Sequence, residues 1–261
     1  MDLGLTDRRA LVLASSRGLG RAIAEALAAE GAHVLVAGRD PARMETVAEA
    51  IRTAGGRADV AIADLADPDV AAALEARVAE TLGHVDILVC NSGGPPPGRM
   101  VDSDLTVMHQ HWQMMVLRLA EITARFLPGM QERRWGRVLT VGSSGVIQPI
   151  PQLGLSNMIR GTLAGWSKSL AGDVAADGVT VNMLLPGRIH TERVDQLDTA
   201  AAERQGTSIE AVREAARATI PAGRYGTPAE FAAVAAFLCS APASYVTGCL
   251  VRCDGGQIRS L

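Results

Sequence analysis

The turn over residues 15–20 is the stretch of this chain best suited to bind a phosphate group. It reads Ser-Ser-Arg-Gly-Leu-Gly and follows a short apolar run, residues 10–14, that predicts a buried strand. Apolar residues then recur at helical spacing as far as Gly31, which predicts a helix starting at the turn. Glycines let backbone N–H groups approach a pyrophosphate, and the positive end of the helix dipole faces it. The pattern indicates a dinucleotide-binding unit, although an ordinary tight turn between strand and helix looks the same.

The rest of the chain supplies the elements that must position this turn. Strand-like runs, nearly all apolar, span residues 10–14, 33–38, 58–63, 85–90, 137–142, 179–184 and 248–253. Helical patterns separate them, over residues 18–31, 41–54, 68–82, 104–133, 152–176, 191–219 and 228–239. We expect the helix over 104–133 to bend or break near Pro128. The alternation predicts one α/β domain over residues 1–261, a doubly wound (Rossmann) fold with a seven-stranded parallel sheet and helices on both faces.

Ligands of such a sheet bind beyond the carboxyl ends of its strands, where this chain places small and polar residues. Sites for NAD of this type carry an acidic residue at the end of the second strand, to bind the ribose 2′-hydroxyl. Here Gly38 and Arg39 stand at that place, and Arg17 adds a second cation from the glycine turn. The two arginines favour NADP(H) over NAD(H), the alternative being that both are exposed charges that aid solubility.

Composition excludes several classes of function. The chain has 261 residues and a net charge of −3, without a basic region suited to nucleic acid. No apolar run approaches the roughly 20 residues that span a membrane, and the N-terminus lacks a signal-peptide core, so we expect a cytoplasmic protein. We expect Cys90, Cys249 and Cys253 to be buried thiols, and no histidine cluster accompanies them to form a metal site.

Five stretches, in order along nearly the whole chain, resemble the short-chain dehydrogenase/reductase family, in particular its 3-oxoacyl-acyl-carrier-protein reductases. They read ASSRGLGRAIAEALAAEGAHV, DILVCNSGG, FLPGMQERRWGRVLTVGSS, LLPGRIHTERV and RYGTPAEFAAVAAFLCSAPASYVTGCLVRCDGG. The resemblance implies an NADP(H) site formed by Ser15, Ser16, Arg17, Gly18, Leu19, Gly20, Arg39, Asp64, Leu65, Asn91, Gly93, Arg160, Pro186, Gly187, Ile189 and Thr191. Two of these residues have structural alternatives: Asp64 as a turn or helix-entry residue, and Asn91 as a hydrogen-bonding residue within the proline-rich loop.

The catalytic positions depart from the family pattern. The family works with Asn, Ser, Tyr and Lys, and these positions fall on Met115, Ser143, Ser156 and Arg160, so that only Ser143 matches. The first glycine of the family's phosphate turn falls on Ala14. In the family the tyrosine exchanges a proton with the substrate oxygen, and the lysine lowers the tyrosine pKa and holds the ribose.

Replacement residues give this site a different proton chemistry. Ser156 and Arg160 share a helix face, and Arg160 retains a cation able to bind ribose hydroxyls. Ser156 is too short and too weakly acidic to protonate a substrate directly, so a water would have to bridge the two. An imidazole group can donate and accept a proton near neutral pH, so His190 is the best replacement acid by chemistry, the alternative being a loop residue that faces solvent.

Two functions follow from these observations. The first is an NADP(H)-dependent oxidoreductase that reduces a ketone or a 3-oxoacyl thioester by a non-standard proton-delivery route, with Ser143, Ser156, Arg160 and His190 as catalytic candidates. The second is a non-redox descendant, either a binding or regulatory protein or an enzyme of lyase, isomerase or cyclase type. The polar segment 188–220 is the expected substrate lid. The resemblance implies a homotetramer or homodimer, a small-molecule carbonyl or acyl substrate, and no nucleic-acid or membrane partner.

Overall fold

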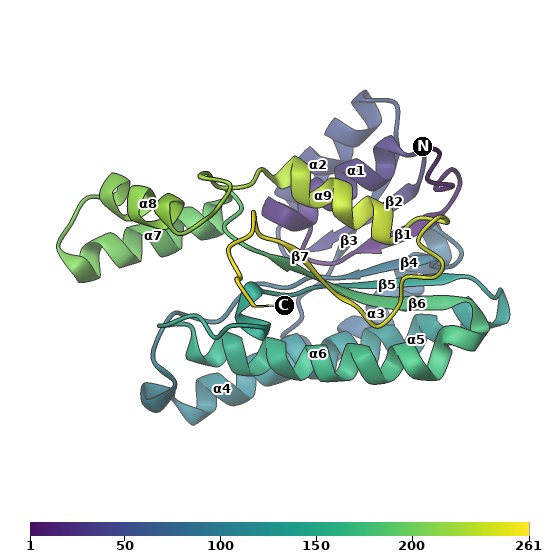
Figure 1. The fold of residues 1–261 in the computed structure, drawn as a ribbon. Helices are drawn as coiled ribbons and strands as arrows, with labels where there is room; N and C mark the ends of the chain where they lie inside the picture. Colours follow the sequence, from purple (N-terminus) through teal and green to yellow (C-terminus); the bar gives the residue numbers. More distant parts are fainter. Residues whose placement is uncertain (261) are drawn as a thin grey trace.

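One parallel sheet forms the centre of the molecule. The computed structural model describes residues 1–260, and its seven strands lie in the order β3-β2-β1-β4-β5-β6-β7 (Figure 1). The strands are β1 Arg9–Val12, β2 His33–Gly38, β3 Arg57–Ile62, β4 Ile87–Cys90, β5 Gly136–Val141, β6 Val179–Pro186 and β7 Leu250–Cys253. The order reverses between β1 and β4, and this switch point is where doubly wound folds bind ligands. The predicted fold class is confirmed.

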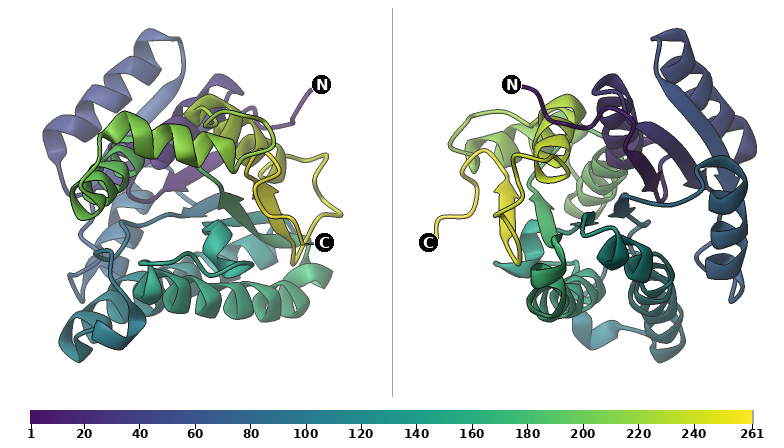
Figure 2. Two further views of the ribbon diagram at one scale, coloured as in Figure 1. Left: turned by 60° about the vertical axis from the view of Figure 1, so that its left-hand side comes forward. Right: turned by 90° about the vertical axis from the view of Figure 1, so that its right-hand side faces the viewer.

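Helices cover both faces of the sheet, as Figures 1 and 2 show. One face carries α1 Gly18–Ala29, α2 Pro41–Thr53 and α9 Pro228–Leu238, and the other carries α3 Val70–Thr81, α5 Arg118–Glu132 and α6 Gly154–Val174. Each layer packs its own apolar cluster, because the side chains of a strand alternate between the two faces: Leu11 belongs to one cluster and Val12 to the other.

The long helix predicted over residues 104–133 is interrupted, but not at the expected place. It consists of α4 Leu105–Trp112, a π-helical turn Gln113–Leu117, and α5, which runs through Pro128 without a break. Pro128 removes the N–H that would bond to the carbonyl of Ala124. Both residues are exposed, so water can satisfy that carbonyl and the helix continues.

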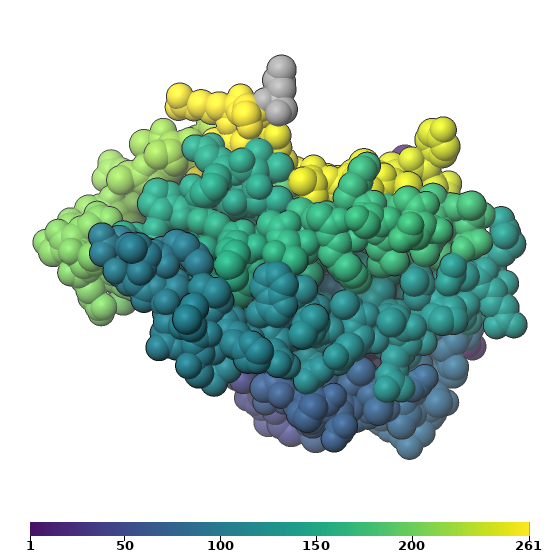
Figure 3. Space-filling model, turned by 90° about the horizontal axis from the view of Figure 1, so that it is seen from below, coloured from purple at the N-terminus to yellow at the C-terminus, as the bar shows by residue number. Residues whose placement is uncertain are grey.

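Three helices lie at one end of the molecule. Figures 1 and 3 place α4 at the same end as α7 Glu192–Gln205 and α8 Ile209–Ala218. Because α4 follows β4 and α7 follows β6, this end is the carboxyl edge of the sheet. The helices α7 and α8 coincide with the predicted lid segment, and Gly206 between them has a positive φ of 64°, which ends α7.

The thiols are only partly as expected. Cys90 and Cys239 are buried, whereas Cys249 is exposed and Cys253 is intermediate. Cys249 immediately precedes β7, which is an edge strand and is therefore covered less than the central strands. Among residues 1–260 no cluster of three or more His, Cys, Asp or Glu side chains could hold a metal ion, and no helix is long and apolar enough to cross a membrane.

Candidate active site

The glycine turn has the geometry of a phosphate cradle. A Cβ added at Gly20 would lie 2.5 Å from the carbonyl oxygen of Ala14, so this position requires glycine. Gly18 starts α1 with a φ of 56°, and a Cβ built there would meet nothing closer than the Thr191 methyl group, at 4.0 Å. The backbone at the N-terminus of α1 thus faces open space opposite Thr191, where a phosphate would find free N–H groups. Ala14, at the position of the missing glycine, adopts a φ of 47°.

Two of the predicted cofactor residues use their side chains within the protein. The Ser15 hydroxyl donates to the Val12 carbonyl (2.7 Å) and accepts from the Ala37 N–H (3.0 Å), and Ser15 is fully buried. The Ser15 N–H also donates, to the Ala37 carbonyl (3.0 Å), so Ser15 supports the turn and has no donor left for a phosphate. Asn91 donates its side-chain amide to the Ala14 carbonyl (3.1 Å), which ties the end of β4 to the glycine turn rather than to the proline-rich loop.

An arginine pair beside the turn already holds an anion. The Nη1 atoms of Arg17 and Arg43 lie 2.7 and 3.6 Å from the same carboxylate oxygen of Glu192, the first residue of α7. The hydrogen bond from Arg17 is the main cause of the lowered pKa of Glu192. Arg39 is exposed and directly follows β2, just before the helix α2 that carries Arg43. A carboxylate bound between two arginines beside a phosphate cradle shows that the donor set suits a ribose 2′-phosphate, so these residues fit NADP(H).

The two candidate serines differ in how they are held. The Ser143 oxygen accepts a hydrogen bond from the Gly145 N–H (3.1 Å), which leaves its own proton free for another acceptor. Asn157 fixes the loop that follows, since its amide group both accepts from the Ile150 N–H (3.2 Å) and donates to the Ile150 carbonyl (3.0 Å). Ser156 precedes Asn157 in the first turn of α6 and is half-buried.

Arg160 is buried at the carboxyl end of β5. Its Nη1 donates to the Val141 carbonyl (2.7 Å), and its exposure is 9%. Burial lowers its pKa to about 10, with a further contribution from the charge of Arg193, so the side chain stays protonated at neutral pH. Arg193, on α7, donates its Nη2 to the carbonyl of Pro95 (2.8 Å) in the loop after β4.

Met115 and His190 do not join these groups. Met115 is 1% exposed and packs in the apolar core from within the π-helical turn, so this position holds no polar side chain. His190 is exposed, and its ring lies 6.5 Å from that of Tyr225. The placement of His190 agrees with the solvent-facing alternative, and its role as an acid stays a prediction.

The remaining predicted cofactor residues lie along the carboxyl edge. Leu65 (9% exposed) and Ile189 (4%) are buried, whereas Gly93 is exposed. Asp64 accepts a hydrogen bond from the N–H of Ala66 (3.0 Å), as in the turn alternative. Pro186 is the last residue of β6, and Gly187 follows it. A Cβ on Gly187 would lie 2.6 Å from the Cα of Asp254.

A buried carboxylate cross-links the segment 188–220, the predicted lid. Asp198 of α7 is fully buried, accepts from the Tyr225 hydroxyl (3.0 Å), and bonds to Nη1 of Arg188. Arg213 of α8 bonds to Asp195 (2.6 Å) and places its Nε 3.6 Å from Asp198. The start of the segment, its two helices and Tyr225 just beyond its end therefore meet at one carboxylate.

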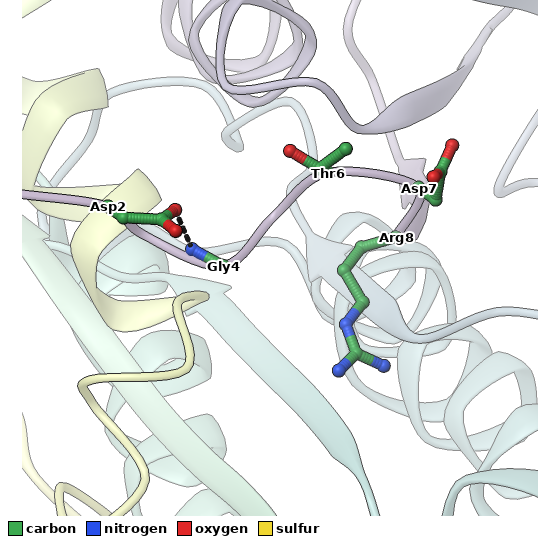
Figure 4. Close-up of a pocket in the computed structure, with 5 residues that line it drawn as sticks. All are labelled: Asp2, Gly4, Thr6, Asp7 and Arg8. Carbon is green, nitrogen blue, oxygen red and sulfur yellow. Dashed lines mark hydrogen bonds between the residues drawn. The ribbon is translucent and has the colours of Figure 1, made fainter.

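A shallow pocket lies elsewhere, near the N-terminus (Figure 4). It is lined by Asp2, Gly4, Thr6, Asp7 and Arg8. These residues precede β1 and therefore lie at the amino edge of the sheet, away from the glycine turn. The pocket is not the candidate active site.

The sequence alone did not identify four residues of this site: Arg43, Asn157, Glu192 and Arg193. Arg43 and Glu192 look like ordinary solvated charges at helix starts, and their contact joins residues far apart in the chain. Asn157 stands out only as a polar residue next to a candidate serine. No local pattern predicts the contact of Arg193 with Pro95, which spans 98 residues.

The chain is similar to known proteins in sequence and in structure. A family model described as enoyl-(acyl carrier protein) reductase matches residues 13–257. The short-chain reductase protein NovJ of Streptomyces niveus is 36% identical over 252 residues, which cover 95% of this chain and 93% of NovJ. The 3-oxoacyl-[acyl-carrier-protein] reductase FabG of Escherichia coli (strain K12) is 35% identical over 254 residues, 95% of this chain and 96% of FabG. The crystal structure of L-sorbose reductase from Gluconobacter frateurii, complexed with NADPH and L-sorbose, covers 100% of both chains with a TM-score of 0.94 at 28% identity.

Proposed function

Because this chain belongs to the short-chain dehydrogenase/reductase family, we propose that it is an NADP(H)-dependent reductase of a ketone or a 3-oxoacyl thioester. The observation that carries this proposal is the carboxylate of Glu192 held by Arg17 and Arg43 beside the glycine turn. The names of NovJ and FabG, both reductases, and the NADPH in the L-sorbose reductase structure support it.

The chain's own residues divide the binding of the cofactor. Backbone N–H groups of residues 16–20 would hold the pyrophosphate, and Arg17, Arg39 and Arg43 would hold the 2′-phosphate. Arg160 would bind the nicotinamide ribose, and Thr191 the carboxamide. When bound, NADPH supplies the hydride that the carbonyl carbon accepts.

Ser143 would polarise the substrate oxygen. Its hydroxyl accepts from Gly145 and so has its proton available to donate to the carbonyl of a substrate. The two hydrogen bonds of Asn157 to Ile150 hold the loop that carries this serine. Asn157 is thus a positioning residue for Ser143.

The proton would reach the substrate oxygen by a non-standard route. A serine hydroxyl at position 156 cannot span the distance that a tyrosine spans, so Ser156 would hold a water that delivers the proton. His190 is the other candidate proton donor. Its side chain is exposed, so its loop would have to move for the imidazole to reach the substrate. The segment 188–220 would act as the lid that covers a small-molecule carbonyl substrate.

Direct titration of the purified protein with NADPH and NADH, followed by nicotinamide fluorescence, tests the proposal. Micromolar binding of NADPH with much weaker binding of NADH is the expected result. Absence of binding by either nucleotide would overturn the redox function.

A non-redox function has one specific observation in its favour. Three of the four family catalytic positions are changed. One of them, Met115, is buried in the core and has no polar group. The paired substitution Ser156→Tyr with Arg160→Lys separates the two functions. If the pair creates ketone reduction where the natural protein has none, the natural protein is not a standard reductase. If the natural protein reduces ketones and the pair changes the rate without creating the activity, the reductase function stands.

A further inference from the structure

Two neighbouring arginines of the candidate site lack an acidic partner. Within residues 1–260, Arg160 and Arg193 form no ion pair with a carboxylate, and the hydrogen bonds recorded for their guanidinium groups go to the neutral carbonyls of Val141 and Pro95. This sets them apart from Arg17, Arg188 and Arg213, whose guanidinium groups all contact carboxylates.

The two guanidinium groups come from different helices and contact segments at the carboxyl ends of two neighbouring strands, β5 and β4. Arg160 comes from α6 and bonds to the last residue of β5, whereas Arg193 comes from α7 and reaches the loop after β4. The charge of Arg193 contributes, after burial, to lowering the pKa of Arg160. Glu192, next to Arg193, points instead toward Arg17 and the glycine turn.

Such an arrangement is unfavourable without an anion. Burial penalises a cation unless an opposite charge or strong hydrogen bonds compensate it, and here burial lowers the pKa of both arginines. The five N–H donors of a guanidinium group match the two oxygens of a carboxylate. An anionic ligand group placed between Arg193 and Arg160 would relieve the repulsion and use donors that face no acid now.

We propose that Arg193, supported by the charge of Arg160, binds an anionic group of the substrate, and that the substrate is an oxo acid, a ketone that carries a carboxylate. This inference rests on the proposed reductase function and names its substrate class. The ketone carbon accepts the hydride of NADPH, which is oxidised to NADP⁺, and the ketone oxygen accepts one proton, while the carboxylate is unchanged. The pyrophosphate of the cofactor is the other source of anionic oxygens, and the test separates the two.

The test compares acids with their neutral esters. The probes are 2-oxobutyrate, acetoacetate and levulinate, which place the carboxylate at three distances from the ketone, each with its methyl ester. Binding to the protein–NADP⁺ complex is measured by the shift of the thermal unfolding midpoint, turnover by NADPH oxidation, and the Kd of NADPH by fluorescence. The variants are Arg193→Met, the conservative Arg193→Lys, and Arg204→Met, which removes an exposed charge from the same helix as a control.

The expected result is that at least one acid binds and reacts on the order of 10- to 100-fold better than its ester, the range of a hydrogen-bonded charge contact. Arg193→Met abolishes that preference with the Kd of NADPH unchanged, Arg193→Lys retains part of it, and Arg204→Met retains all of it. The inference is overturned if no acid is preferred, if the preference survives in Arg193→Met, or if Arg193→Met weakens NADPH as much as the acid. Failure of the natural protein to bind NADPH would instead overturn the proposed function itself.

Discussion

Replacing Glu192 by glutamine tests whether this carboxylate occupies the place of the 2′-phosphate. Glu192 is held by Arg17 and Arg43, and the hydrogen bond from Arg17 lowers its pKa, so it is ionised at neutral pH. To bind NADPH through those arginines, the protein must first break the contact. Glu192→Gln removes the competing charge and keeps the size of the side chain, so the variant should bind NADPH more tightly.

The geometry limits the size of the effect. The side chains of Glu192, Arg17 and Arg43 are 56%, 51% and 52% exposed, and exposed ion pairs contribute little because water screens them. We therefore expect the Kd of NADPH to fall by about two- to fivefold at low salt. The gain should disappear near 1 M salt, where the Debye length is about 3 Å. The Kd of NADH should not change, because NADH lacks the 2′-phosphate.

Fluorescence titrations of both nucleotides at low and high salt measure these quantities. Glu203→Gln, which removes an exposed carboxylate near the other end of α7, is the matched control and should leave both affinities unchanged. An unchanged NADPH affinity at low salt would refute the reasoning. An equal gain for NADH would also refute it, because the contact would then obstruct the whole cofactor site rather than the 2′-phosphate.

Three further predictions have defined outcomes. Gly20→Ala places a methyl group 2.5 Å from the Ala14 carbonyl and should lower the free energy of unfolding by about 1–3 kcal/mol. Gly165→Ala, exposed in α6 with no atom within 4 Å of the added Cβ, should raise it by up to about 1 kcal/mol; equal thermal unfolding of the two variants would contradict this contrast. Burial is the main cause that lowers the pKa of His84 from 6.5, so the unfolded chain takes up the proton first and stability should fall as the pH drops through 6.5. Urea unfolding from pH 5 to 8 should show a weaker decline in His84→Gln, and an unchanged decline would exclude His84 as its source. Asn157→Ala removes both hydrogen bonds to Ile150 and should lower kcat without changing the Kd of NADPH; an unchanged kcat would show that Ser143 needs no such support.

The sheet was predictable because of how parallel strands are buried. Strands such as β4 and β5 are covered on both faces, so they appear in the sequence as continuous apolar runs whose ends can be located from the pattern. The glycine turn was predictable for a related reason, since its function depends on the local backbone at Gly18 and Gly20. The position of Ser143 follows from the end of β5.

Features that depend on contacts between distant segments were not predictable. The break in the long helix lies at Gln113–Leu117 rather than at Pro128, because the exposed carbonyl of Ala124 tolerates the missing N–H. The exposure of Cys249 depends on β7 being an edge strand, which is a property of the strand order. The direction of Arg193 depends on how α7 lies relative to the loop after β4.

The buried carboxylate of Asp198 limits how the predicted lid, residues 188–220, can move. Asp198 joins α7 to Arg188 at the start of the segment and to Tyr225 just beyond its end, and Arg213 joins α8 to the same group. Bending at Gly206 would pull Arg213 of α8 away from Asp195 and Asp198 of α7. We therefore expect the two helices to open as one cooperative unit. Their backbone amides should therefore exchange with deuterium through a single shared opening event, with the flexible points outside the cluster rather than at the turn between the helices.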